Sequence, residues 1–130
     1  MAVTFLSAEW LETLVAEAEG LPEVDGVDLT VQYEVAGAPD GKVRFFLEWR
    51  SGRLAEAALG KNADAEVFIQ VKSPDALRLL NGELDADVAY MQGRLKIDGE
   101  YRKFVVDHRD WRRSDAQREL WARMAELTSD

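Results

Sequence analysis

The chain has 130 residues, no cysteine and a single histidine, His108. The absence of cysteine excludes thiol catalysis, disulfide scaffolds, iron–sulfur clusters and cysteine-ligated zinc. One histidine also falls short of the several nitrogen or sulfur ligands that a zinc or iron site needs. His108 lies among charged residues, and the chain has no G-x-S-x-G motif. We therefore interpret His108 as a surface or helix-end residue rather than as part of a nucleophilic triad.

Long apolar runs are also missing. No stretch approaches the roughly 20 apolar residues that span a bilayer, so the sequence predicts no transmembrane segment. The first residues lack the positive region of a secretory signal, and the ending Thr128-Ser129-Asp130 is not a peroxisomal address. We therefore expect a cytoplasmic protein.

Positive charge is scarce, with 16 Lys or Arg against 25 Asp or Glu and a net charge of −9. This balance argues against a nucleic-acid partner, whose phosphates are bound mostly by Lys and Arg. The basic residues are densest at Arg109, Arg112 and Arg113. Such a run is typical of a solvated helix face. The alternative is a contact with an acidic partner or an anionic lipid surface.

The length fits one domain, and 47% hydrophobic residues are enough for a core. Ser7 is a suitable N-cap for a first amphipathic helix, strand-like alternation starts near Leu29, and Ser73-Pro74 is a helix start. The pattern predicts a single α+β domain over 1–130. Its expected elements are an N-terminal helix about 7–19, a β-meander of antiparallel hairpins about 28–72, helices about 74–92, a strand about 93–98 and C-terminal helices about 100–127.

Two motif fragments do not develop into sites. Gly60-Lys61-Asn62 lacks the earlier glycine and the Ser or Thr of a phosphate loop, and the sequence after Asp85-x-Asp87 lacks the ligands of a calcium loop. We predict no metal, no cofactor and no catalytic residue. What remains is a surplus of apolar side chains. They either pack into a solid core or leave an apolar pocket between sheet and helices, and composition is compatible with both.

One ordered set of motifs is more specific. It is Ser73-Pro74-Asp75, then Leu80-Asn81-Gly82-Glu83-Leu84-Asp85, then Ala89-Tyr90-Met91-Gln92-Gly93-Arg94-Leu95-Lys96-Ile97-Asp98-Gly99. In this order the motifs resemble the sterol carrier protein 2 (SCP-2) family of small lipid-binding domains. The order of elements from Leu29 to Trp111 is also similar, so the resemblance covers about two thirds of the chain.

The resemblance implies a five-stranded, mostly antiparallel sheet covered by helices, with an apolar tunnel between the layers. It also implies a non-enzymatic protein that binds a sterol, a fatty acid or a fatty acyl-CoA. The expected ligand-binding residues of the cavity are Val43, Phe45, Leu47, Trp49, Ile69, Val71, Leu77, Leu80, Leu84, Val88, Met91, Phe104, Trp121 and Met124. The missing peroxisomal signal makes the chain resemble the bacterial stand-alone members.

Two other functions stay open at this stage. The first is a protein-interaction or oligomerisation module that assists a partner enzyme, which the apolar residues Phe46 and Phe68 on the outer sheet face favour. The second is an enzyme of the ketosteroid isomerase type, with Tyr33 or Tyr90 in an apolar pocket. The expected partners are an apolar small molecule, a membrane in transient contact and a second copy in a homodimer.

Overall fold

The computed structural model describes residues 2–39 and 41–129. Asp40, which the sequence places in the turn between two strands, and the terminal Met1 and Asp130 lie outside these residues. Within the described residues, no helix is both long and apolar enough to cross a membrane.

The two ends of the chain are joined by a short parallel pair of strands. Strand β1 (Val3–Thr4) pairs with β7 (Thr128–Ser129), and neither strand was expected from the sequence. Helix α1 (Ala8–Glu17) follows β1 and continues into a 3₁₀ turn, η1 (Ala18–Gly20), within the expected range of 7–19 apart from the last residue. Ser7 caps α1 as expected, because its side chain accepts a hydrogen bond from the backbone N–H of Trp10.

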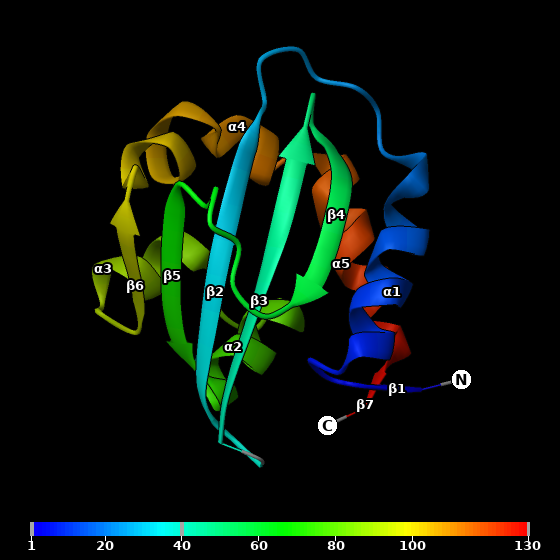
Figure 1. The fold of residues 1–130 in the computed structure, drawn as a ribbon, viewed down its shortest axis with the longest axis vertical. Coiled ribbons are helices and arrows are strands. Elements are labelled where there is room, and N and C mark those ends of the chain that lie inside the picture. Colours follow the sequence, from blue (N-terminus) through cyan, green and yellow to red (C-terminus); the bar gives the residue numbers. More distant parts are fainter. Residues whose placement is uncertain (1, 40, 130) are drawn as a thin grey trace.

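The main sheet has five strands and is mostly antiparallel, as predicted. Its strands lie in the order β4-β3-β2-β5-β6 (Figure 1). Their bounds are β2 (Leu29–Ala38), β3 (Gly41–Arg50), β4 (Arg53–Leu59), β5 (Val67–Lys72) and β6 (Leu95–Gly99). Tyr33 lies opposite Phe45 and beside Ile69, so the apolar positions of neighbouring strands share one inner face.

The expected run of antiparallel hairpins is wrong at β5, which pairs in parallel with β2 instead of returning beside β4. The segment 60–66 carries the chain across the outer face of β3 and β2 to reach this place (Figure 1). Gln32 holds the segment, because its Nε2 donates to the carbonyl of Gly60 (2.8 Å) and its Oε1 accepts from the N–H of Asn62 (2.8 Å). A link of this length is longer than a tight hairpin turn and permits the crossing.

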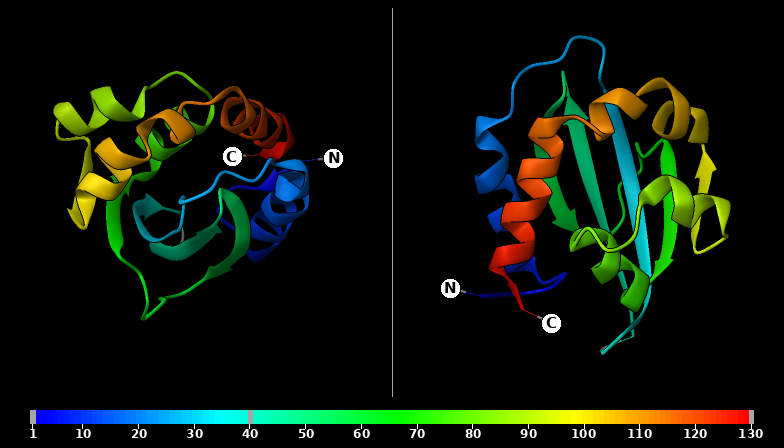
Figure 2. Two further views of the ribbon diagram at one scale, coloured as in Figure 1. Left: turned by 90° about the horizontal axis from the view of Figure 1, so that it is seen from above. Right: turned by 180° about the vertical axis from the view of Figure 1, so that it is seen from behind.

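The helices after β5 cover the inner face of the sheet (Figure 2). They are α2 (Ser73–Leu80), α3 (Ala86–Met91), the π-helical turn η2 (Lys103–Asp107), α4 (Arg109–Arg112) and α5 (Asp115–Leu127). Helix α1 lies beside the edge strand β4 and beside α5 (Figures 1 and 2). The side chains of Leu14, Leu29, Leu47 and Leu120 are fully buried, so α1, the sheet and α5 share one core.

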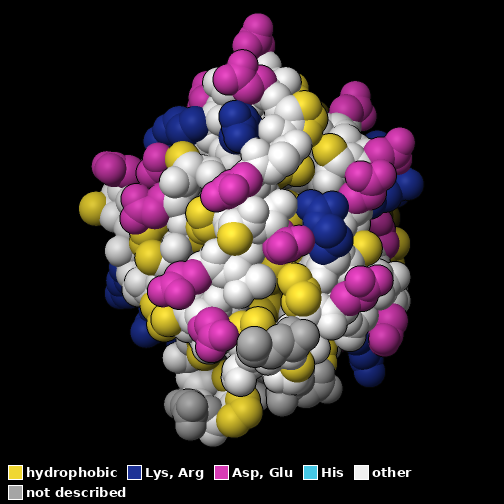
Figure 3. All heavy atoms as spheres, turned by 90° about the vertical axis from the view of Figure 1, so that its right-hand side faces the viewer, with side chains coloured by type: hydrophobic (Ala, Val, Ile, Leu, Met, Phe, Trp, Pro, Cys, Tyr) yellow, Lys and Arg dark blue, Asp and Glu magenta, His cyan; other side chains and the backbone are white. Residues whose placement is uncertain are grey.

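The surface reflects the negative charge of the sequence. The side of the molecule that carries α1 shows acidic side chains spread between small apolar patches, with isolated Lys and Arg among them (Figure 3). This face therefore offers no broad basic surface of the kind that binds phosphates.

Candidate ligand cavity

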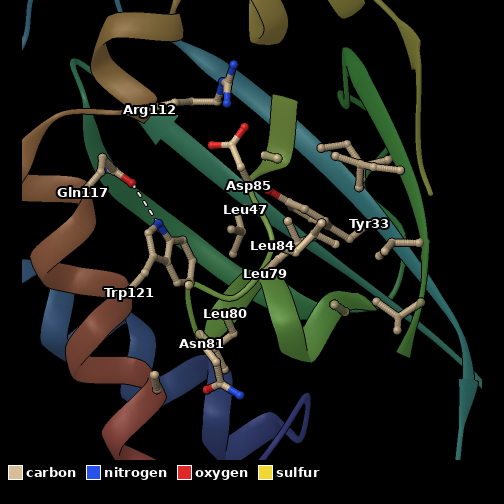
Figure 4. Close-up of a pocket in the computed structure, with 18 of the residues that line it drawn as sticks. Tyr33, Leu47, Leu79, Leu80, Asn81, Leu84, Asp85, Arg112, Gln117 and Trp121 are labelled. Atoms are coloured by element: carbon tan, nitrogen blue, oxygen red, sulfur yellow. Dashed lines mark hydrogen bonds between the residues drawn. The ribbon is translucent and has the colours of Figure 1, made fainter. Parts of the chain in front are cut away.

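A cavity of about 760 Å³ lies between the inner face of the sheet and the helices (Figure 4). Its floor is the inward alternation of β2, β3 and β5, and its walls come from α2, the α2–α3 connection, η2, α4 and α5. The lining is mainly apolar. The apolar side chains therefore do both: many pack into a shared core, and others line a pocket beside it.

Aromatic pairs shape the floor of the cavity. The rings of Tyr33 and Phe45 stack with their centroids 4.7 Å apart, since these residues are register partners on β2 and β3. Further along β3, Trp49 meets Trp111 edge to face at 4.9 Å, and this contact fastens the segment after η2 to the sheet. Large rigid rings thus define both the floor and one end.

Nine of the fourteen expected cavity residues line this space. They are Phe45, Leu47, Trp49, Ile69, Val71, Leu80, Leu84, Phe104 and Trp121. The period of two along β3 and β5 explains most of them, because alternate residues of a strand point to the same face. Their role in ligand binding stays a prediction.

Val88 and Met91 were expected in the cavity, but they point to solvent, with exposed fractions of 43% and 83%. The reason is the helical period of α3. Ala86 lines the cavity and Ala89 is fully buried, and residues two positions from either lie on the opposite side of the helix. The small alanines of α3 face the fold, and Val88 and Met91 do not.

Three further expected residues lie outside the cavity lining for different reasons. Val43 is partly buried near the turn of the β2–β3 hairpin, where its partner Val35 lines the cavity and Val43 does not. Leu77 is partly buried against the core, beside the face of α2 that lines the cavity through Leu79 and Leu80. Met124 is fully buried, and it shares a stripe of α5 with Leu120 rather than the adjacent stripe of Trp121 that faces the cavity.

The cavity also has polar lining, namely Tyr33, Asp85, Arg112 and Gln117 among others (Figure 4). The sequence analysis placed Tyr33 in a pocket only in the isomerase alternative, and it did not assign the other three. Tyr33 could have been found, because it belongs to the same inward alternation of β2 as its apolar neighbours. Burial raises the pKa of Tyr33 far above its ordinary value, and the charge of Arg112 offsets only part of this effect. The phenol therefore stays protonated.

Arg112 is a buried structural cation rather than part of a solvated face. Its side chain is only 9% exposed, its Nε donates to the carbonyl of Phe104 (2.8 Å), and its guanidinium lies over the Phe104 ring at 4.6 Å. It also pairs with Asp87 on α3 at 2.8 Å. The interpretation of this basic run as a solvated helix face is thus wrong for Arg112.

Arg109 and Arg113 extend the same network. Arg109 pairs with Asp87 at 3.2 Å, and Arg113 pairs with Asp85 at 2.7 Å and with Asp87 at 3.1 Å. Burial acts to raise the pKa of both carboxyls, but it is outweighed, and both pKa values are lowered. The hydrogen bond from the Val88 N–H and the Arg113 guanidinium lower the pKa of Asp85, and the Arg112 and Arg109 guanidinium groups lower that of Asp87. The network ties α4 to α3.

This network predicts a stability that decreases in acid. A carboxyl whose pKa is lowered by folding stabilises the fold above its ordinary pKa, 3.8 here, and loses that contribution as the pH falls through the lowered value. We expect Asp87→Asn to reduce stability at pH 7 by about 1 kcal/mol after allowance for solvent screening, a few degrees in Tm. The difference from the unmodified chain should shrink between about pH 5 and pH 2.

Thermal unfolding followed by circular dichroism at several pH values measures this effect. Asp110→Asn, at an exposed position of α4, is the matched control and should have little effect at any pH. A constant gap between the Asp87→Asn and unmodified curves down to pH 2 would show that the network does not act through ionised carboxylates.

The arrangement offers little for catalysis. Within residues 2–39 and 41–129, no group of three or more His, Asp or Glu side chains is placed to hold a metal ion. Asp85 lines the cavity, but its carboxylate is engaged by Val88 and Arg113 and its lowered pKa makes it a poor general base at neutral pH. Of the two tyrosines that an isomerase would use, Tyr33 lines the cavity and Tyr90 does not.

Comparison with known proteins identifies a family. The family model described as the SCP-2 sterol transfer family matches residues 8–105. Comparison with curated proteins gives no match.

Solved structures share the fold over nearly the whole chain. A crystal structure of sterol carrier protein 2 is 16% identical, with a TM-score of 0.73 over 95% of this chain and 99% of that protein. A conserved hypothetical protein from Thermus thermophilus, described as "possibly sterol carrier protein", is also 16% identical, with a TM-score of 0.65 over 100% of this chain and 94% of its own. Palmitated SCP2L2 from Aedes aegypti is 18% identical, with a TM-score of 0.58 over 81% of this chain and 89% of that one.

Proposed function

Because this chain belongs to the SCP-2 sterol transfer family, we propose that it binds an apolar ligand in the cavity and carries it without chemical change. The observation that carries the proposal is the cavity itself, a half-open and mainly apolar space of about 760 Å³ between sheet and helices. Ligand sites are commonly clefts of roughly 300–1,000 Å³ with apolar walls and a few placed polar groups.

The ligand class follows from the walls. Leu47, Ile69 and Leu80 come from three different elements and offer continuous apolar contact. Each buried methylene of a ligand gains about 0.8 kcal/mol, so a long tail binds without a strong polar anchor. The palmitate in the Aedes aegypti relative and the sterol in the name of the family both fit this description. A fatty acid, a fatty acyl group or a sterol is therefore the proposed ligand.

Native mass spectrometry of freshly purified protein, with organic extraction of any adduct, tests the proposal. We expect a lipid to co-purify, or palmitate or cholesterol to add in a one-to-one ratio on exposure. A mass that stays that of the protein alone after exposure to fatty acids, acyl-CoA and sterols would refute it. The same spectrum reports whether the chain forms the expected homodimer.

The alternative function as an interaction module loses part of its basis in the structure. Phe46 was expected on an exposed outer face, but it is 7% exposed because it lies on the face that the segment 60–66 crosses. Phe68 remains 43% exposed, and a single residue of this kind is common on protein surfaces. The carrier function is therefore the one that the structure supports better.

A further inference from the structure

Strand β6 (Leu95–Gly99) forms one edge of the main sheet, at the end of the strand order, and pairs along one side with β5 (Figure 1). Within residues 2–39 and 41–129, no other strand pairs with its second side. The opposite edge strand, β4, differs because helix α1 lies beside it. A strand edge of this kind presents backbone N–H and C=O groups that can pair with a further strand. A second copy of the chain brings an identical edge.

The side chains of β6 alternate between the two faces of the sheet. Leu95 and Ile97 are buried on the inner face, whereas Lys96 and Asp98 are exposed on the outer face. Neither Lys96 nor Asp98 makes an ion pair with any residue in the described parts of the chain. Edge strands are commonly protected by charges of one sign, which repel a second copy. One Lys and one Asp, two residues apart, do not give this protection.

The geometry of a two-fold dimer restricts how two copies of β6 can pair. Two identical edge strands related by a two-fold axis run antiparallel, and residues directly opposite each other point to the same face. A register that keeps both buried faces on one side therefore places an outer residue opposite an outer residue. Centring the pair on Lys96 would oppose two lysines, and centring it on Asp98 would oppose two aspartates. Centring it on Ile97 places each Lys96 opposite Asp98 of the second copy.

From the edge position of β6 and this order of charges, we propose that β6 is a homodimer interface, in which two copies pair antiparallel about Ile97 and join their sheets into one. Arg94 and Glu100 flank the strand with opposite charges at positions that are also symmetrical about Ile97. Arg94 already contacts Asp75 at 3.5 Å, so the two Lys96–Asp98 pairs carry the selectivity. Lys96 and Asp98 do not line the cavity, so this inference goes beyond the proposed function and does not depend on it.

The dimer is expected to be weak. A strand of five residues forms a small interface, of the size found in transient complexes, so we expect a Kd on the order of tens of micromolar. The net charge of −9 on each copy also opposes association. Measurements therefore belong at about 0.15 M salt, which screens repulsion between charges more than about 8 Å apart.

Exchange of the two charges tests the interface. Lys96→Asp places carboxylates opposite each other, Asp98→Lys places ammonium groups opposite each other, and the double variant Lys96→Asp/Asp98→Lys restores opposite charges. Glu56→Lys, at an exposed position of β4, changes the net charge by the same amount as Asp98→Lys and is the matched control. Sedimentation velocity of the full chain over about 5–500 µM gives the dimer Kd of each variant. Circular dichroism melting curves establish that all variants are folded.

We expect each single variant to weaken the dimer at least about tenfold, because both cross-strand pairs become repulsive. The double variant should return to within about threefold of the unmodified chain, and Glu56→Lys should stay within about twofold of it. A mixture of the two single variants gives the most specific result. Lys96→Asp and Asp98→Lys should form a heterodimer with each other more tightly than either associates with itself, since an acidic edge then meets a basic edge.

Three results would overturn this inference. The first is an unmodified chain that stays monomeric up to about 500 µM. The second is a dimer with the same Kd in the unmodified chain and in the single variants, since such a dimer uses another surface. The third is a mixture of the two single variants that associates no more tightly than each variant alone, which would exclude the register about Ile97.

Discussion

Gly99→Ala is expected to lower the free energy of unfolding by about 3 kcal/mol, the sum of a backbone penalty of about 1–2 kcal/mol and the strain of a steric clash. Gly99 ends β6 with a φ of +75°, which L side chains rarely adopt. A Cβ at this position would lie 2.4 Å from the carbonyl oxygen of Glu66 and 2.9 Å from Cδ2 of Phe68. The backbone atom cannot move aside, because the same oxygen accepts the N–H of Glu100 at 2.8 Å.

Gly93→Ala is the matched control. Gly93 has nearly the same dihedral, φ +77°, but a Cβ there would meet nothing within 4 Å. It should therefore show only the backbone penalty, about 1 kcal/mol. Urea denaturation of the two variants measures both free energies. Equal losses in Gly99→Ala and Gly93→Ala would show that the contact with Glu66 and Phe68 relaxes without significant strain.

The inner face of the sheet could be predicted from the sequence because strand geometry has a period of two. Phe45, Leu47 and Trp49 alternate with polar or outward residues, and one buried face fixes their direction. The starts of these helices could also be predicted from the sequence, since Ser7 caps α1 and Asp85 caps α3 through their own side chains. These features depend on residues close together in the chain.

The path of the chain between strands could not be predicted in the same way. The sequence of β5 predicts a strand whether the chain returns beside β4 or crosses to β2, because the inner face of β5 is apolar in both cases. The choice depends on contacts such as Gln32 with Gly60 and Asn62, which lie about 30 positions away. A glutamine in an amphipathic strand gives no sign that its side chain will hold a distant segment.

The polar lining residues of the cavity could not be predicted from the sequence for a related reason. Arg112 and Gln117 lie in a charged stretch that is typical of a solvated helix, and only tertiary packing buries them. Asp85 and Asp87 were considered as a calcium-loop fragment, but their partners are arginines more than 20 residues later. Polar residues of this kind become recognisable only when the fold shows which charges meet.

Filling part of the cavity is expected to weaken ligand binding strongly while keeping the fold. Ala76 lines the cavity from α2, where its side chain is only partly buried, so a tryptophan at this position can extend into the open space. If the indole displaces about four methylenes of a bound tail, the loss is about 3 kcal/mol, or on the order of a hundredfold in the Kd of palmitate. Tryptophan should cost little stability, because it adds apolar contacts where the cavity now has none.

Ala16→Trp is the control for this prediction, since Ala16 is exposed on α1 and does not line the cavity. Displacement of a fluorescent fatty acid gives the Kd, and melting curves compare the folds. Ala125→Phe repeats the test from α5, a neighbouring wall of the cavity, in case Ala76→Trp does not fold. Unchanged palmitate affinity in a folded Ala76→Trp or Ala125→Phe variant would place the ligand outside the part of the cavity that α2 and α5 line, since an acyl chain and a large side chain cannot occupy the same volume.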